Sequence, residues 1–274
     1  MIRGPIFLMP AFLMLVGLTA CGTTSEPLLS SAMAQAQVAD KEARRALRDG
    51  QLMRAQNGFN KVLVLQQSQD DTSGAATTMI NLATVAHQLN EHHGALAWLD
   101  RVLMEDSNLY PANLQLVAAF RKSVMLADLS RLDEADSSLK IAEQLCDKNC
   151  AQKFGLEVLR ARLLLLNGKV EAALSLAQTV SSDSGADKGE RANALRIVAT
   201  SEEKLERYEE AFQHYQAALE ADKALGFSER IATDLNGLAR VAKQLGNERE
   251  ADEYSRRALI VQESLRKIDA MPKK

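Results

Sequence analysis

The stretch ERYEEAFQHYQAAL, residues 206–219, decides the fold of this 274-residue chain. Within it, Ala211, Tyr215 and Ala218 stand four and three residues apart, which is the spacing of one face of an α-helix. Five further stretches follow the same pattern, and they begin at Gly50, Asn90, Ser130, Gly168 and Gly246. Six copies of one helical pattern indicate that the chain is built from a repeat.

A small residue marks each copy of the repeat. At intervals of 38 to 40 residues this position holds Ala55, Ala95, Ala135, Ala173, Ala211 and Ala251. A second helical stripe precedes the copies, most clearly in Leu82, Ala83 and Ala86, so each unit is a pair of helices. Two antiparallel helices approach closely only where the side chain at their crossing is small, which explains the alanine. One pair cannot bury its apolar faces alone and needs stacked neighbours.

These units resemble the tetratricopeptide repeat in their Ala-x3-aromatic spacing, in the Gly or Asn at the turn between the helices, and in the small residue seven positions earlier. The resemblance implies an all-α fold, a right-handed superhelical α-solenoid of about six helix pairs over residues 35–268, with a short tail at 269–274. The chain departs from the family in its period, which exceeds the usual 34 residues or so. It also lacks the early tryptophan and the closing proline of a typical unit.

The N-terminus has the layout of a secretory signal. Arg3 is followed by an apolar run from Ile6 to Val16 that contains Pro10 and no acidic residue. This run is shorter than the roughly 20 apolar residues that a membrane-spanning helix needs. We therefore expect a cleaved signal peptide and no transmembrane helix in the mature protein.

The signal ends in LTAC, Leu18 to Cys21, which resembles the bacterial lipobox. The resemblance implies a signal peptide over residues 1–20, lipid modification at Cys21 and a short lipidated tether over 21–34. More than one acyl chain on one residue gives a stable anchor. Gly22 after the cysteine implies, again by resemblance, the periplasmic face of a Gram-negative outer membrane. The alternative is an ordinary secretory signal with a coincidental cysteine.

Two further cysteines remain if Cys21 carries lipid. Cys146 and Cys150 flank the turn-forming Asp147-Lys148-Asn149, and an oxidising compartment favours a disulfide between them. Such a short loop closes little chain entropy, so the expected stabilisation lies at the low end of the usual few kcal/mol. The alternatives are two free thiols, or half of a metal site, for which no nearby Cys or His has matching spacing.

No motif supports catalysis. A net charge of −3 makes nucleic acid an unexpected partner. His87, His92 and His93 form the one cluster of metal-ligating side chains, and we interpret them as solvated residues around a turn that need not share a face. The chain has no zinc-hydrolase, phosphate-loop or nucleophile motif. We therefore expect a protein that is not an enzyme and that uses no metal or cofactor.

The first helix of each pair is expected to line a concave groove. The register of the turns places basic and amide side chains there, namely Arg44, Arg48, Asn81, Arg121, Arg162, Arg196, Asn236, Arg240 and Lys243, with Asn193 and the acids Asp40, Asp128 and Glu203. In an acidic protein, arginines on one face suit a carboxylate-bearing segment, because the guanidinium is a forked donor. By resemblance these residues form a carboxylate clamp. The alternative is that the exposed faces of helices are usually charged.

Two functions are compatible with this sequence. The first is a membrane-anchored periplasmic scaffold or adaptor that binds a partner protein of the cell envelope, through acidic or C-terminal carboxylates, in assembly, secretion or wall-enzyme recruitment. In that case, reversal of Arg196 and Arg240 to Glu should abolish binding without harming the fold. The alternative is a carrier for a small ligand or cell-wall fragment. A sugar carrier would need aromatic platforms, and the only tryptophan, Trp98, lies on a second helix.

Overall fold

The structure is a computed structural model that describes Met1 and residues 31–104, 109–147 and 150–270. Cys21 and the motif before it lie outside the described residues. The first helix begins at Ser31, four residues before the start that the repeat predicts. Within the described part of the chain, no helix is long and apolar enough to span a bilayer.

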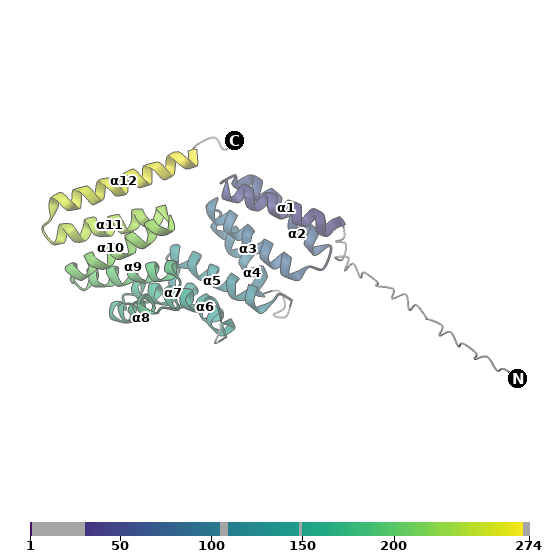
Figure 1. The fold of residues 1–274 in the computed structure, drawn as a ribbon, viewed down its shortest axis with the longest axis horizontal. Helices are drawn as coiled ribbons and strands as arrows, with labels where there is room; N and C mark the ends of the chain where they lie inside the picture. Colours follow the sequence, from purple (N-terminus) through teal and green to yellow (C-terminus); the bar gives the residue numbers. More distant parts are fainter. Residues whose placement is uncertain (2–30, 105–108, 148–149, 271–274) are drawn as a thin grey trace.

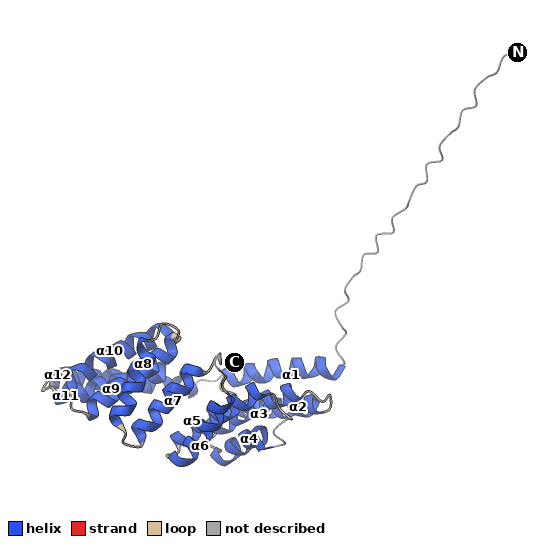
Figure 2. Cartoon of the chain, turned by 90° about the horizontal axis from the view of Figure 1, so that it is seen from below, coloured by secondary structure: helices blue, strands red, loops and turns tan. Residues whose placement is uncertain are grey.

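All the regular elements of the described residues are helices (Figure 2). They are α1 (Ser31–Arg48), α2 (Leu52–Gln67), α3 (Thr72–Gln88), α4 (His92–Met104), α5 (Ala112–Asp128), α6 (Leu132–Leu145), α7 (Lys153–Leu166), α8 (Val170–Ser182), α9 (Lys188–Lys204), α10 (Tyr208–Leu225), α11 (Ser228–Gln244) and α12 (Glu248–Ala270). Each odd-numbered helix packs against the even-numbered helix that follows it. The six helix pairs that the repeat predicts are therefore confirmed.

The turn inside every pair has one conformation. Its left-handed residue has a φ of 59° to 79° in all six copies, at Gly50, Asn90, Ser130, Gly168, Glu206 and Gly246. In the first copy the backbone N–H of Gly50 donates to Leu47 O at 3.0 Å, and that of Gln51 donates to Ala46 O at 2.8 Å. This is the Schellman arrangement, which satisfies the last carbonyls of a helix and reverses the chain. One turn geometry repeated six times makes the array regular.

The recurring alanine lies at the helix crossing, as its size predicts. All six copies are at most 5% exposed. The position four residues later is also buried in the first five pairs, where residues such as Phe59 and Tyr215 occupy it. In the sixth pair this position is Ser255, which is exposed because α11 is the only described helix that packs against α12.

The odd-numbered helices lie on the inner side of the array. From α3 to α11, each of them contacts the next odd-numbered helix directly as well as its even-numbered neighbours. The array runs from α1 to α12, and α12 forms the edge at its C-terminal end (Figure 1). We call the surface that the odd-numbered helices turn away from the even-numbered ones the inner face.

The connection between α6 and α7 carries the disulfide. The structure joins Cys146 and Cys150 with a Cα–Cα distance of 5.3 Å. Arg160 on α7 also binds α6, because its guanidinium donates to Asp136 Oδ1 at 2.9 Å and to both carboxylate oxygens of Glu143. This half-buried cluster ties α7 to the preceding pair.

Candidate functional site

All nine predicted groove residues lie on odd-numbered helices. Arg44 and Arg48 are on α1, Asn81 on α3, Arg121 on α5, Arg162 on α7, Arg196 on α9, and Asn236, Arg240 and Lys243 on α11. The turn register therefore assigned these residues to the correct helices. The side chains differ in what they contact, and this difference divides the inner face into two regions.

Arg196 belongs to a buried ion cluster. Its side chain is 16% exposed, and both of its carboxylate partners, Asp222 of α10 and Asp234 of α11, are fully buried. Arg196 Nε donates to Asp234 Oδ1 at 2.6 Å, and its Nη2 donates to Asp222. Its remaining nitrogen, Nη1, donates to Asn193 Oδ1 at 3.1 Å. Every guanidinium nitrogen has a partner within the protein, so Arg196 holds α9, α10 and α11 together and has no nitrogen left unpaired for a ligand.

The expectation that Arg196 can be reversed without harming the fold is therefore wrong. A glutamate at this position would leave three acidic groups together in a buried site, where unpaired charge is strongly destabilising. Asp222 and Asp234 already lie close together. Burial, with the adjacent Asp222 as a further cause, raises the pKa of Asp234 to about 6.

Arg240 is also paired, although its side chain is half exposed. Its Nε and Nη2 donate to the two carboxylate oxygens of Glu203 at 2.7 and 2.9 Å. Tyr215 OH donates to Glu203 Oε2 at 2.8 Å. The hydrogen bonds to Glu203 raise the pKa of Arg240, and burial raises the pKa of Tyr215. The close approach of α10 and α11 depends on Gly237, where an added Cβ would lie 2.4 Å from the Tyr215 ring.

Two arginines on the other helices form simpler pairs. Arg44 Nε donates to Asp40 Oδ2 at 2.7 Å within α1, and Arg162 Nη2 donates to Asp128 Oδ1 at 2.7 Å from α7 to α5. The acids that the sequence placed in the groove are thus the partners of its arginines. These pairs reach solvent and are worth little individually.

The inner face of α5 contains an arginine without a carboxylate partner, and Arg48 on α1 and Lys243 on α11 are likewise exposed and make no ion pair among the described residues. Arg121 Nη1 donates to Thr84 Oγ1 at 2.9 Å, and Arg121 makes no ion pair among the described residues. Its side chain is open to solvent, yet enough protein surrounds the guanidinium for desolvation to lower its pKa. One turn from Thr84 along α3, the buried Nδ2 of Asn81 lacks a hydrogen-bond partner in the described part of the chain. A solvent-reachable cation and an unused amide donor therefore lie on neighbouring helices.

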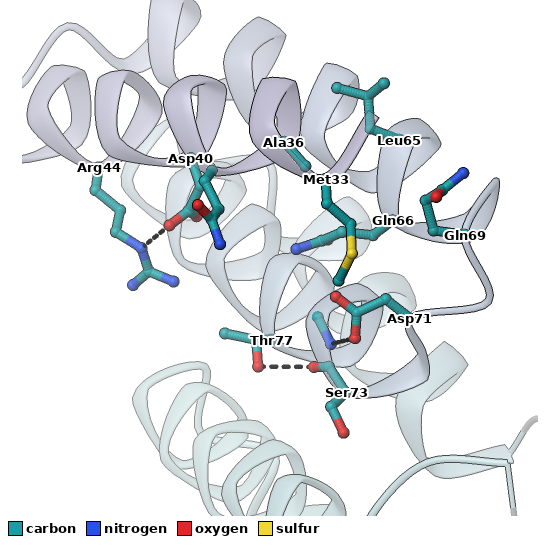
Figure 3. A pocket seen from close by; sticks show the side chains of 12 residues that line it. Met33, Ala36, Asp40, Arg44, Leu65, Gln66, Gln69, Asp71, Ser73 and Thr77 are labelled. Carbon is teal, nitrogen blue, oxygen red and sulfur yellow. Dashed lines mark hydrogen bonds and ion pairs between the residues drawn. The ribbon is translucent and has the colours of Figure 1, made fainter. Parts of the chain in front are cut away.

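A pocket of about 300 Å³ opens beside this region, between α1, the end of α2 and the start of α3 (Figure 3). Asp40, Arg44 and Thr77 form its inner-face side. Asp71 caps α3 by accepting the Gly74 N–H at 2.8 Å. Asp40 Oδ1 is buried without a hydrogen-bond partner among the described residues. The pocket thus has both acceptors and donors.

The histidine interpretation needs a correction. The rings of His87 and His92 have centroids 5.5 Å apart and both are half-buried, so these two residues pack together across the turn instead of being solvated separately. His93 is exposed, as expected. Within the described residues, no three His, Cys, Asp or Glu side chains are grouped so that they could hold a metal ion.

Two buried acids, Asp222 and Asp234, were missed by reasoning from the sequence. Asp222 lies on the second helix of its pair, outside the faces expected to line the groove, and it extends an apolar stripe four residues after Ala218. Asp234 interrupts an apolar face four residues before Leu238. A carboxylate in a buried stripe signals a paired charge. Both signals were present in the sequence.

Two segments match sequence models of the tetratricopeptide repeat, residues 75–103 and residues 190–264. No curated protein matches the chain significantly. Among solved structures, the apo form of RapI aligns with a TM-score of 0.72 at 13% identity, covering 87% of each chain.

Other solved structures share this architecture. PilW, a widely conserved type IV pilus biogenesis factor, aligns with a TM-score of 0.60 at 15% identity over 80% of this chain and 90% of its own. A signal-transduction ATPase with a tetratricopeptide repeat sensor, from Pyrococcus horikoshii, aligns with a TM-score of 0.59 at 17% identity over 86% of this chain and 36% of its own. At such identities the likeness shows the fold alone. The chain therefore contains tetratricopeptide repeats at residues 75–103 and 190–264, and its six helix pairs fold as an α-solenoid.

Proposed function

We propose that this protein is a membrane-anchored periplasmic scaffold that binds a partner protein of the cell envelope on the inner face of α3 and α5. The observation that carries the proposal is Arg121, a solvent-reachable cation on the inner face that no carboxylate of the described residues neutralises. An arginine in this setting favours an acidic side chain or a C-terminal carboxylate, which it can bind through two parallel donors.

Other donors on the inner side differ in their access to solvent. Arg48 lies exposed at the end of α1, whereas the amide nitrogen of Asn81 is buried. The region around Arg196 and Arg240 is neutralised internally by Asp222, Asp234 and Glu203, so it serves the fold instead. The proposed site is therefore narrower than the groove that the sequence alone suggests.

The binding test compares two charge-reversal variants, one on the inner face and one outside it. Arg121→Glu should weaken capture of the partner by at least about tenfold, because it removes a charge-assisted bond and adds repulsion. Lys61→Glu makes the same charge change on exposed α2 and should have no effect. Binding to the wild type should also weaken with salt. Equal, salt-independent capture by both variants would rule out this site.

The carrier alternative rests on the pocket beside α1. Its volume of about 300 Å³ lies at the small end of ligand sites. A small ligand held there would protect the protein from thermal unfolding, and Arg121→Glu would leave that protection unchanged. This result would favour the carrier over the scaffold.

The anchor is tested at Cys21. In the proposed location, Cys21→Ser should release the protein from the membrane or leave the precursor uncleaved, and the wild type should carry acyl chains by intact mass. An unacylated, soluble wild type would disprove the anchor. The same periplasmic proposal includes the Cys146–Cys150 disulfide: neither thiol should react with an alkylating reagent in freshly isolated protein.

A further inference from the structure

The last helix leaves an apolar position uncovered. Leu259 occupies the place in α12 that Leu63 has in α2 and Leu219 in α10, eight residues after the recurring alanine. Leu63 and Leu219 are 5% and 3% exposed, because α3 and α11 pack against their helices. Leu259 is 57% exposed, and so is the adjacent Ile260. A helix that only closed the array would need neither side chain.

Charged residues continue the surface around this apolar centre. Asp252, Arg256, Leu259, Glu263 and Lys267 recur every three or four residues and are all exposed, whereas Ala251, Tyr254 and Ala258 bury the opposite side of the helix. We call the five exposed residues together with Ile260 the outer stripe. None of its four charged side chains forms an ion pair within the described part of the chain. Their charges are therefore available to a partner.

The order of these charges is self-complementary. Arg256 stands three residues before Leu259 and Glu263 three residues after Ile260. Asp252 and Lys267 are likewise equidistant from that centre, seven residues on either side. If two copies of α12 lie antiparallel with their centres together, Arg256 of each copy faces Glu263 of the other, and Asp252 faces Lys267. Each attractive pair then occurs twice by symmetry.

Other pairings of the same helix are disfavoured. A parallel pair in register places every charge opposite an identical one. An antiparallel pair shifted by four residues, about one turn, puts Asp252 opposite Glu263, and a shift in the other direction puts Arg256 opposite Lys267. Like charges placed opposite each other suppress such arrangements.

From this pattern we infer that the outer stripe of α12 binds a second copy of this chain as a symmetric antiparallel helix pair. Leu259 and Ile260 form the apolar centre, and four ion pairs form the rim. A contact along one helix buries an area at or below about 1,200 Å², which is typical of weak, reversible association. The dimer should therefore depend on protein concentration. In the single chain, α12 lies at the C-terminal edge of the array (Figure 1).

Charge reversal tests the inference without touching the core. Sedimentation of the full chain from about 1 to 100 μM should show a monomer–dimer equilibrium. Arg256→Glu and Glu263→Arg should each weaken the dimer by about tenfold or more, since two attractive pairs become repulsive. Lys61→Glu serves as the control, because it reverses a charge on α2. Equal melting temperatures would show that each variant is folded.

Mixing the two variants provides the decisive measurement. In the mixed dimer, one copy carries glutamate at both positions of the pair and the other copy carries arginine at both, so every facing pair is again attractive. Association should therefore return to about the wild-type level. Recovery on mixing supports the symmetric pair, because a general loss of stability would not be repaired. A wild type that stays monomeric overturns the inference, and so does a dimer that neither reversal affects, or two variants that fail to associate when mixed.

Discussion

The inner faces of α3–α5 and of α9–α11 have the same architecture but use their arginines differently. In α9–α11, Arg196 and Arg240 bind carboxylates of their own repeats, and Asp222 and Asp234 are fully buried. In α3–α5, Arg121 binds only the hydroxyl of Thr84 among the described residues. In α9–α11 the two arginines hold helices together, whereas in α3–α5 the charge of Arg121 stays available for binding.

Two second helices differ at one position of the repeat. At the position eleven residues after the recurring alanine, α10 has Asp222 and α2 has Gln66. Asp222 brings a negative charge into the layer below the inner face, which Arg196 neutralises. Gln66 instead accepts a neutral hydrogen bond from Thr78 at 2.7 Å and attracts no arginine. The buried carboxylate of α10 thus binds the arginine of α9, whereas the matched position of α2 carries no charge.

The largest expected effect comes from removing the central arginine of the C-terminal region. Arg196→Gln leaves two buried carboxylates without a countercharge and should lower the free energy of unfolding by about 3–5 kcal/mol. The matched change Arg121→Gln should alter it by no more than about 0.5 kcal/mol. Urea denaturation of both variants measures the contrast. Equal effects would mean that the two regions do not differ in the way described.

The second-largest expected effect concerns the contact between Gly237 of α11 and Tyr215 of α10. In Gly237→Ala the added methyl meets the ring of buried Tyr215, whose hydroxyl is held by Glu203. Overpacking of this kind should cost about 1–3 kcal/mol. Gly94→Ala, where the nearest atom lies 4.0 Å from the new Cβ, should instead be neutral or stabilising by up to about 1 kcal/mol. A Gly237→Ala protein that melts like the Gly94→Ala variant would contradict the close packing of α10 on α11.

A pH titration examines the buried carboxylates directly. The pKa of Asp234 is raised from 3.8 to about 6, so between these values the folded state binds a proton more readily than the unfolded state does. The contribution of Asp234 to stability is therefore fully present below pH 3.8 and is lost as the pH rises through about 6. The stability of the wild type relative to Asp234→Asn should fall across this interval. Asp133→Asn, which removes an exposed carboxylate, controls for the loss of charge alone. If the difference in stability between the wild type and Asp234→Asn stays constant with pH, then folding does not raise the pKa of Asp234.

Sequence periodicity predicted the fold because every repeat uses the same local devices. The recurring alanine and the left-handed turn residue are set by their own helix pair, so each of them can be read from a short window. The disposition of Arg196 depends on Asp222 and Asp234, which lie 26 and 38 residues away on two other helices. Helical register places a side chain on a face but does not identify what lies beneath it. The sequence therefore assigned the candidate site to the correct helices. Only the structure showed which arginines pair with carboxylates of the protein and which do not.

The smallest expected effect lies where the two regions meet. Arg162 of α7 and Asp128 of α5 are joined at 2.7 Å, and their side chains are 38% and 39% exposed. Because water screens both groups, a double-mutant cycle with Arg162→Gln and Asp128→Asn should give a coupling energy of about 0.2–1 kcal/mol. This coupling should shrink as salt is added. The same cycle on Arg196 and Asp234, whose carboxylate is fully buried, should give a larger coupling that salt changes less. If the coupling at Arg162 is as large and as insensitive to salt as that at Arg196, then the ion pairs of the inner face all stabilise the fold. Arg121 would then be an exception among the arginines of this face.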